Sequence, residues 1–155
     1  MDGSLTQSVA LLAVVGLGLS AGALLTEGAV LVPFWQSLDP EEFLHWYQRN
    51  AALLLRFFAP LEIAPALLAV LATVSFFYDG RPGSGMSALS SLLALGVLLA
   101  FPLYFRAANA SFADATIGLE RVTTELRRWA AWHWARTFVA MAAFVAGLSA
   151  LVGLG

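Results

Sequence analysis

Four long apolar segments divide the chain, and short polar stretches separate them. They cover roughly residues 5–33, 40–77, 86–108 and 117–152, and the clearest break is the Asp-Gly-Arg-Pro-Gly-Ser-Gly run that begins at Asp79. Each segment is long enough to cross a hydrocarbon core of about 30 Å, because an α-helix rises about 1.5 Å per residue. The pattern predicts an all-α, integral membrane four-helix bundle that forms one transmembrane domain over residues 1–155.

The composition agrees with lipid as the main solvent of the chain. Hydrophobic residues make up 60% and charged residues 12% of it, with a mean hydropathy of +0.80, whereas soluble domains carry about 25% charged residues. The chain has no cysteine, which excludes disulfides, thiolate metal sites and cysteine nucleophiles. No basic tract indicates nucleic acid. The expected partners are therefore the lipid bilayer and, as open alternatives, other membrane subunits or further copies of the chain.

All basic residues are arginines, and all but Arg81 fall toward one end of the predicted bundle. Cytoplasmic ends of membrane helices carry an excess of arginine and lysine. We therefore expect this arginine-rich end in the cytoplasm and both termini on the outer side of the plasma (inner) membrane. The N-terminal stretch lacks the positive region of a secretory signal, so the first segment is expected to remain as a mature helix. The arginines concerned are Arg49, Arg56, Arg106, Arg121, Arg127, Arg128 and Arg136.

The second and fourth segments are too long for the membrane alone. At about 37 residues each, they would reach roughly 55 Å as helices, so both must tilt or protrude at the arginine-rich end. Asp39 is expected to cap the second helix, with Pro40 in its first turn. The cap of the fourth helix stays open among Ser111, Asp114 and Thr116. Internal prolines at which we expect kinks are Pro60, Pro65 and Pro102.

Ionisable side chains gather inside the arginine-rich end. Glu27 is the only one in the first apolar segment, and a charge inside a membrane costs at least about 2.5 kcal/mol unless it faces the interior and is paired. We therefore expect Glu27 to pair with an arginine of another helix. Such a set could form a polar and aromatic pocket for an apolar ligand, or it could consist of ion pairs that fix helix register. In the second case, Glu27 and Glu62 would pair with Arg56, Arg106 and Arg136. The candidate catalytic residues are His133, Arg136 and Glu27, and the candidate substrate-binding residues are Arg56, Arg106, Asn109 and Trp132.

No pattern in the chain indicates a metal or an organic cofactor, and we expect none. His45 and His133 would differ in height by roughly 18 Å if their helices began level, which is too far for two axial ligands of one haem. The sequence contains no His-Glu-x-x-His, no paired Glu-x-x-His and no glycine-rich phosphate loop.

The most specific motif opens the fourth helix. Residues 125–137, Glu-Leu-Arg-Arg-Trp-Ala-Ala-Trp-His-Trp-Ala-Arg-Thr, resemble the Trp-x-x-Trp-His/Asn-x-x-Arg-Thr signature of the anthrone-oxygenase-like family. This is a group of small four-helix membrane proteins, most without an assigned function. Residues 22–35, in which Pro33 ends the first helix, and Asn109 after the aromatic end of the third helix resemble two further family patterns. At the latter, Ala110-Ser111 replaces the family's Val-Pro.

The resemblance implies a four-helix membrane bundle and, for a minority of members, cofactor-independent oxidation of an anthrone to an anthraquinone. It matches His133 to a position that holds histidine or asparagine in relatives, and it matches Arg136 and Asn109 to more constant positions. Asparagine at the first position argues against a general-base role there across the family.

Two classes of function follow, and whether the chain is an enzyme stays open. As a cofactor-independent oxygenase for an apolar, anthrone-like substrate, it would use His133 or Glu27 as the base and Arg136 or Arg106 to stabilise an enolate. As a non-catalytic accessory subunit, it would bury its small-residue faces against other membrane proteins. An internal cavity that touches Arg136 would favour the enzyme, and exposed small-residue seams would favour the subunit. A transporter is disfavoured, because four helices without inverted repeats seldom form a translocation path.

Overall fold

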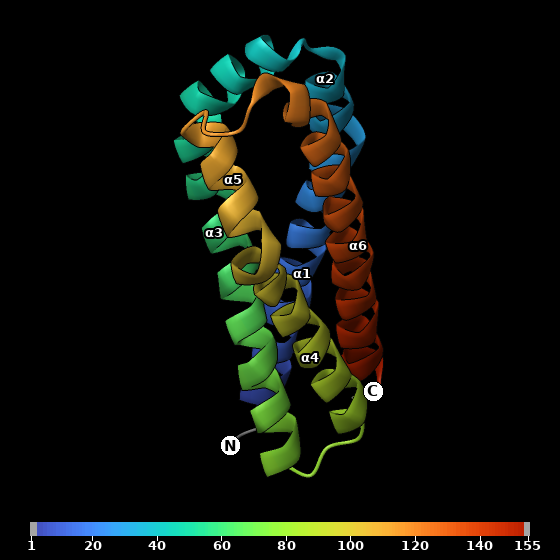
Figure 1. Ribbon diagram of the computed structural model, residues 1–155. Helices are drawn as coiled ribbons and strands as arrows, with labels where there is room; N and C mark the ends of the chain where they lie inside the picture. The colour runs from blue at the N-terminus through green and yellow to red at the C-terminus, as the bar shows by residue number, and fades with distance from the viewer. Residues whose placement is uncertain (1–2, 154–155) are drawn as a thin grey trace.

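Helices make up almost all of the computed structural model, which describes residues 3–153 (Figure 1). Four continuous helical rods are long and apolar enough to cross a membrane, and the described residues include no strand. The predicted all-α class with four membrane-spanning helices is therefore confirmed. The first rod comprises α1 (Gly3–Thr26), η1 (Glu27–Leu31) and α2 (Val32–Ser37); the second is α3 (Pro40–Tyr78); the third comprises α4 (Ser84–Ala100), η2 (Phe101–Phe105) and α5 (Arg106–Ala113); the fourth is α6 (Leu119–Val152).

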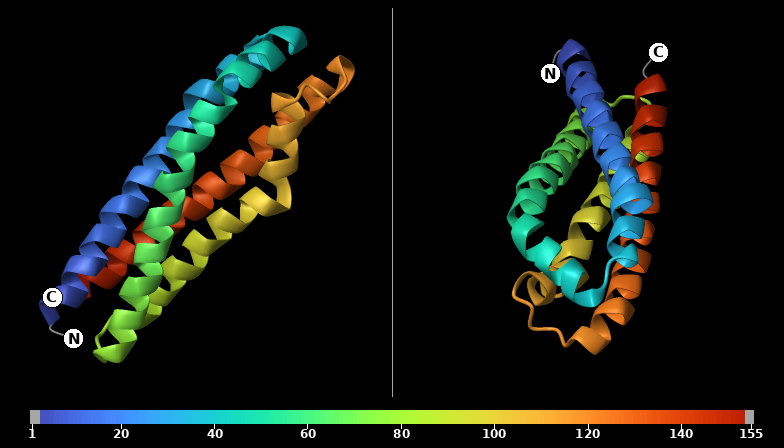
Figure 2. Two further views of the ribbon diagram at one scale, coloured as in Figure 1. Left: turned by 90° about the vertical axis from the view of Figure 1, so that its left-hand side faces the viewer. Right: turned by 90° about the horizontal axis from the view of Figure 1, so that it is seen from above.

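The rods run alternately up and down and close into a ring. The first rod and α4 each pack against both α3 and α6, and the two ends of the described chain lie at the same end of the bundle (Figures 1 and 2). The arginine-rich end lies at the opposite end of the bundle. That the arginine-rich end faces the cytoplasm stays a prediction.

The interior of the bundle changes character along its length. Near the chain ends the buried positions are mostly alanine, for example Ala13, Ala69 and Ala143, which lets the helices approach closely. At the arginine-rich end the core is aromatic, and the Trp35 ring contacts both Phe43 and Trp129. Aromatic rings are much larger than alanine side chains, so the helices lie farther apart at this end. The candidate site lies here.

Two of the rods contain a π-helical segment beside a proline. In η1 the Val32 N–H donates to the Glu27 carbonyl, five residues back, and Pro33 follows directly. In η2, which contains Pro102, the Arg106 N–H donates to the Phe101 carbonyl in the same way. A proline has no N–H to donate, and the wider turn lets the helix continue past it. The first rod therefore does not end at Pro33 but reaches Ser37.

Other predicted boundaries also change. The third rod reaches Ala113 rather than ending near residue 108, so Asn109 lies inside a helix. Gly118 occupies the cap position of α6, and none of the three proposed capping residues does. Asp39 occupies the cap position of α3, although its side chain makes no capping hydrogen bond. Pro60 and Pro65 lie within α3, which runs on past both.

Charge spacing indicates where the hydrocarbon lies. Between Arg56 and Tyr78, α3 carries only one charged residue, Glu62, and the third rod carries none from Ser84 to Phe105. Each stretch has about 22 residues and spans about 33 Å, close to the thickness of a hydrocarbon core. The charged first part of α3, before Arg56, protrudes by roughly 24 Å.

Candidate functional site

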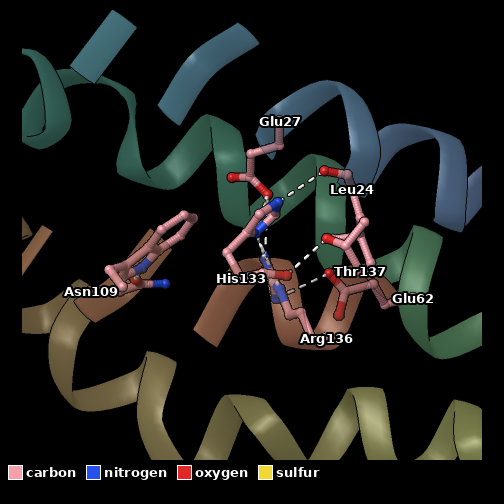
Figure 3. Close-up of polar contacts among 8 residues, drawn as sticks. Leu24, Glu27, Glu62, Asn109, His133, Arg136 and Thr137 are labelled. Atoms are coloured by element: carbon pink, nitrogen blue, oxygen red, sulfur yellow. Dashed lines mark hydrogen bonds and ion pairs between the residues drawn. The ribbon is translucent and has the colours of Figure 1, made fainter. Parts of the chain in front are cut away.

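A buried ion cluster joins three of the four rods (Figure 3). Arg136 of α6 donates through Nη2 to Oε2 of Glu27 at 3.2 Å and through Nη1 to Oε1 of Glu62 at 3.4 Å. Glu27 is 4% and Arg136 8% exposed. The predicted pairing of Glu27 with an arginine of another rod is confirmed, and it is the arrangement that buried charges in a membrane require.

The cluster has more acidic than basic groups. Two carboxyl groups face one guanidinium, and the Arg136 guanidinium carbon lies 4.1 Å from the centroid of the Phe105 ring, which covers it on one side. The other carboxyl oxygens, Glu27 Oε1 and Glu62 Oε2, accept no hydrogen bond from any described residue. These two oxygens therefore retain acceptor capacity for a further donor.

His133 lies behind Arg136 and orients it. Its Nε2 is 2.9 Å from the Leu24 carbonyl oxygen, and its Nδ1 is 3.2 Å from Arg136 Nη2. A carbonyl oxygen only accepts hydrogen bonds, so Nε2 carries the hydrogen, and Nδ1 accepts from Arg136. The fully buried imidazole also stacks on Trp129 at 5.1 Å between ring centroids.

A cavity of about 530 Å³ lies beside the cluster, between α3 and the third rod. Its volume is in the range of small-molecule sites, which measure about 300–1,000 Å³. Most of its wall is apolar, with Leu54, Phe58 and Leu98 among the lining side chains. The charged and amide groups at the wall are Glu27, Glu62, Arg106, Asn109 and Arg136.

The structure brings together most of the predicted site residues. Arg106 and Asn109 line the cavity with Glu27 and Arg136, and Asn109 Oδ1 accepts a hydrogen bond from the Trp129 indole at 2.8 Å. His133 does not line the cavity; it contacts Arg136 from the opposite side. It therefore positions Arg136 and has no direct access to a bound molecule.

Two predicted binding residues lie elsewhere. Arg56 is exposed and does not line the cavity, because it lies about 120° around α3 from the centre of the lining face at 100° per residue. Trp132 stacks flat on Tyr104, with ring centroids 5.1 Å apart, away from the cavity. Trp129, one turn earlier on α6, lines the cavity instead.

Glu62 was not among the candidate site residues, although the sequence placed it in the set of expected ion pairs. It is the only charged residue in the apolar part of α3, so the argument that selects Glu27 selects it equally. Of the arginines expected to pair with it, its partner is Arg136 on another rod.

The arrangement offers hydrogen-bond acceptors and a cation at the inner wall of an apolar cavity. Carboxylates there can accept a proton from a bound molecule, and the guanidinium can stabilise the negative charge left behind. No group of three or more His, Asp or Glu side chains within residues 3–153 could hold a metal ion. No protein-family model, curated protein or solved structure matches this chain.

Proposed function

We propose that the cavity binds an apolar aromatic molecule and that its carboxyl wall removes a proton from an activated carbon of that molecule. The reaction would be the cofactor-independent oxidation of an anthrone-like substrate. The observation that supports this most is the pair of carboxyl groups at the wall of an apolar cavity of about 530 Å³, both bonded to Arg136 and each with one oxygen that accepts no hydrogen bond from a described residue. The resemblance of residues 125–137 to the anthrone-oxygenase-like signature points to the same chemistry.

Glu27 is the proposed base, and Arg136 is the proposed electrostatic stabiliser. Glu27 lines the cavity and is held by Arg136 Nη2 through Oε2, which leaves Oε1 able to accept a proton. Removal of a proton from a carbon beside a carbonyl leaves a delocalised anion, and a fixed cation nearby stabilises it. His133 would keep Arg136 in this position through its Nδ1 acceptor.

Oxygen serves as the oxidant in this proposal, and the atoms balance. Glu27 takes one proton from the methylene carbon, and the resulting carbanion gives its electron pair to O₂ as a C–O bond forms. The second hydrogen of that carbon then leaves as a proton while the O–O bond breaks, which yields the ketone. One oxygen atom stays in the product, and the other leaves as water with the two protons.

The packing of small residues supports the enzyme over the accessory subunit. Ala13 and Ser20 of the first rod are buried inside the bundle. A Cβ at Gly16 would come within 2.9 Å of the Pro65 ring, so this seam is already used for packing within the chain. Gly22, Gly85 and Gly96 face open space. The two on α4 are separated by the exposed Leu89 and Leu92, so these glycines do not form a small-residue seam for a partner helix.

Oxygen uptake by the purified protein in nanodiscs, with anthrone as substrate, tests the proposal. We expect Glu27→Gln to lower the rate by about 10²-fold or more, the usual contribution of a general base. Glu120→Gln removes an exposed carboxylate and should leave the rate unchanged. Absence of anthrone-dependent oxygen uptake above the protein-free rate would overturn the oxygenase proposal, and so would a folded Glu27→Gln variant with wild-type activity.

The arginine-rich end is proposed to face the cytoplasm of the inner membrane. Because the chain has no cysteine, single cysteines can be introduced at the exposed positions Ser4 and Arg121, which lie at opposite ends of the bundle. In intact cells, a membrane-impermeant maleimide should label the cysteine at position 4 and not the one at position 121. The opposite labelling pattern would reverse the orientation.

A further inference from the structure

The cavity beside Arg136 opens sideways through the wall of the bundle. Ile63 of α3 and Phe101 of η2, on the facing rod, both line it, and they are 46% and 37% exposed. Figure 2 shows α3 and the third rod leaning apart toward the arginine-rich end. The opening is therefore a gap between two neighbouring helices.

One part of this opening faces hydrocarbon. Ile63 lies seven residues from Arg56 and Phe101 five residues from Arg106, both on the side without other exposed charges. These separations place the two residues about 10 Å and 7 Å inside the level of the arginines. The opposite part of the opening, at Arg106 and Ala110, lies at or beyond the membrane surface.

The inner end of the cavity selects for hydrogen-bond donors. Two carboxyl groups and one guanidinium meet there, and Arg136 is already bonded to both carboxyl groups and to His133. A bound anion at this place would lie against two carboxyl groups, and the cation there, Arg136, is already paired with them. A hydroxyl group, in contrast, can donate to the free Oε2 of Glu62.

We infer that the ligand is a membrane-dissolved hydroxyaromatic molecule, which enters from the lipid between Ile63 and Phe101 and donates its hydroxyl to Glu62. This inference rests on the proposed use of the cavity as a binding site for an aromatic molecule. It does not depend on oxidation. The rings remain among the apolar side chains, and the polar group reaches the ion cluster.

The selectivity is tested with three probes that are already oxidised at the ring. In nanodiscs at mildly acidic pH, 2-hydroxyanthraquinone, 2-methoxyanthraquinone and anthraquinone-2-carboxylate are titrated by quenching of tryptophan fluorescence. The hydroxyl compound should bind about tenfold or more tightly than the ether, as a hydrogen bond to a charged group predicts, and the carboxylate should bind most weakly. Glu62→Leu should abolish the preference for hydroxyl over ether, whereas Glu120→Leu should preserve it. Equal binding of hydroxyl and ether by the wild type, or tightest binding of the carboxylate, would overturn the inference.

The route is tested in the folded protein by blocking one position at a time. Single cysteines at Ile63, Leu67 and Ala110 are labelled with benzylmaleimide, and association of the hydroxyl probe is followed before and after labelling. Ile63 and Ala110 line opposite parts of the opening, and Leu67 is a lipid-facing control, 61% exposed and one turn away on α3. Labelling at 63 should abolish fast association of the probe, by which we mean association at the rate of the unlabelled protein. Labelling at 67 or 110 should leave this rate unchanged.

The outcomes separate this inference from the proposed function. Loss of fast association on labelling at 110 but not at 63 would show that the ligand arrives from water. Equal effects of labelling at 63 and 67 would remove the evidence for a lateral opening. Both results would overturn the route even if the protein oxidises anthrone. Conversely, binding of the hydroxyl probe through the lateral opening without any oxygen uptake would leave this inference standing and overturn the oxygenase.

Discussion

Replacement of Arg136 should destabilise the protein more than replacement of either acidic partner. Arg136→Met removes the donor to Glu27 at 3.2 Å, to Glu62 at 3.4 Å and to His133 at 3.2 Å, and it leaves two buried carboxyl groups without a cation. At an effective dielectric constant of about 20, each ion pair at these distances contributes roughly 5 kcal/mol of attraction. Desolvation offsets part of this, so we expect a net loss of about 3–5 kcal/mol.

Glu62→Gln is the matched comparison. The amide oxygen of glutamine can still accept from Arg136, and Arg136 keeps Glu27 as its ionic partner. Only the charge on one acceptor is lost, which should cost about 1 kcal/mol, the difference between charged and neutral hydrogen bonds. Adding Glu27→Gln to Arg136→Met should recover part of the lost stability, because it removes one of the stranded charges.

Unfolding in mixed micelles with increasing SDS, followed by far-UV circular dichroism, measures these differences. Arg127→Met, an exposed arginine on the same helix, serves as the control and should change the free energy of unfolding little. If Arg136→Met costs no more than Glu62→Gln, the ionic cluster does not stabilise the bundle, and the reasoning is refuted.

Three further substitutions test other parts of the bundle. Gly28→Ala should destabilise by about 1–3 kcal/mol, because a Cβ at Gly28 would lie 3.1 Å from the hydrogen-bonded His133 ring; denaturant titration measures this. The Thr6 hydroxyl donates to Asp79 and lowers the pKa of that carboxyl below its usual 3.8, so Thr6→Val should reduce the acid-dependent loss of thermal stability between about pH 5 and pH 2. The Ser90 hydroxyl donates to a backbone carbonyl of α6 at 2.7 Å, and Ser90→Ala should cost about 0.6–1.7 kcal/mol by SDS unfolding.

Each of these substitutions has a control in the chain. Gly22→Ala adds a methyl group to open space and should not destabilise; equal effects at Gly22 and Gly28 would count against close contact as the cause. A lowered carboxyl pKa stabilises the fold above the unfolded value, and this contribution is lost as pH falls through the folded value. Thr6→Ser keeps the hydroxyl, so it should retain the wild-type pH profile. Ser8→Ala removes only an exposed bond within one helix, and a loss as large as that of Ser90→Ala would refute the interhelical explanation.

Hydropathy and arginine position were sufficient to predict the number of helices, because each membrane span must satisfy its backbone within one long apolar segment. The ends of the rods were harder to predict. Pro33 and Asn109 look like helix ends in sequence, yet both lie within continuous rods. Beside Pro33, a π turn changes the hydrogen-bonding pattern, and propensity alone does not indicate such a turn.

Within the site, the cost of burying charge identified Glu27 correctly, and helical spacing placed Arg136 near it. The spacing of residues along α6 could not decide whether His133 or Trp129, which both lie near Arg136, faces the cavity. His133 and Trp129 both lie on the Arg136 side of α6, and packing against the first rod puts His133 behind the arginine. That choice depends on contacts between rods, which a single helix does not encode.

The two π segments make the length of the chain critical at two points. Each can be regarded as a regular helix with one additional residue. Deletion of the exposed Ala29 in η1 would restore a regular helix, but it would rotate the following residues by about 100° relative to the preceding ones. Either Glu27 could face Arg136 or Trp35 could fill the aromatic core, but not both. A one-residue deletion in η1 or η2 would therefore change the site more than most substitutions, and preserved length at these two places should distinguish proteins that share the site from proteins that share only the bundle.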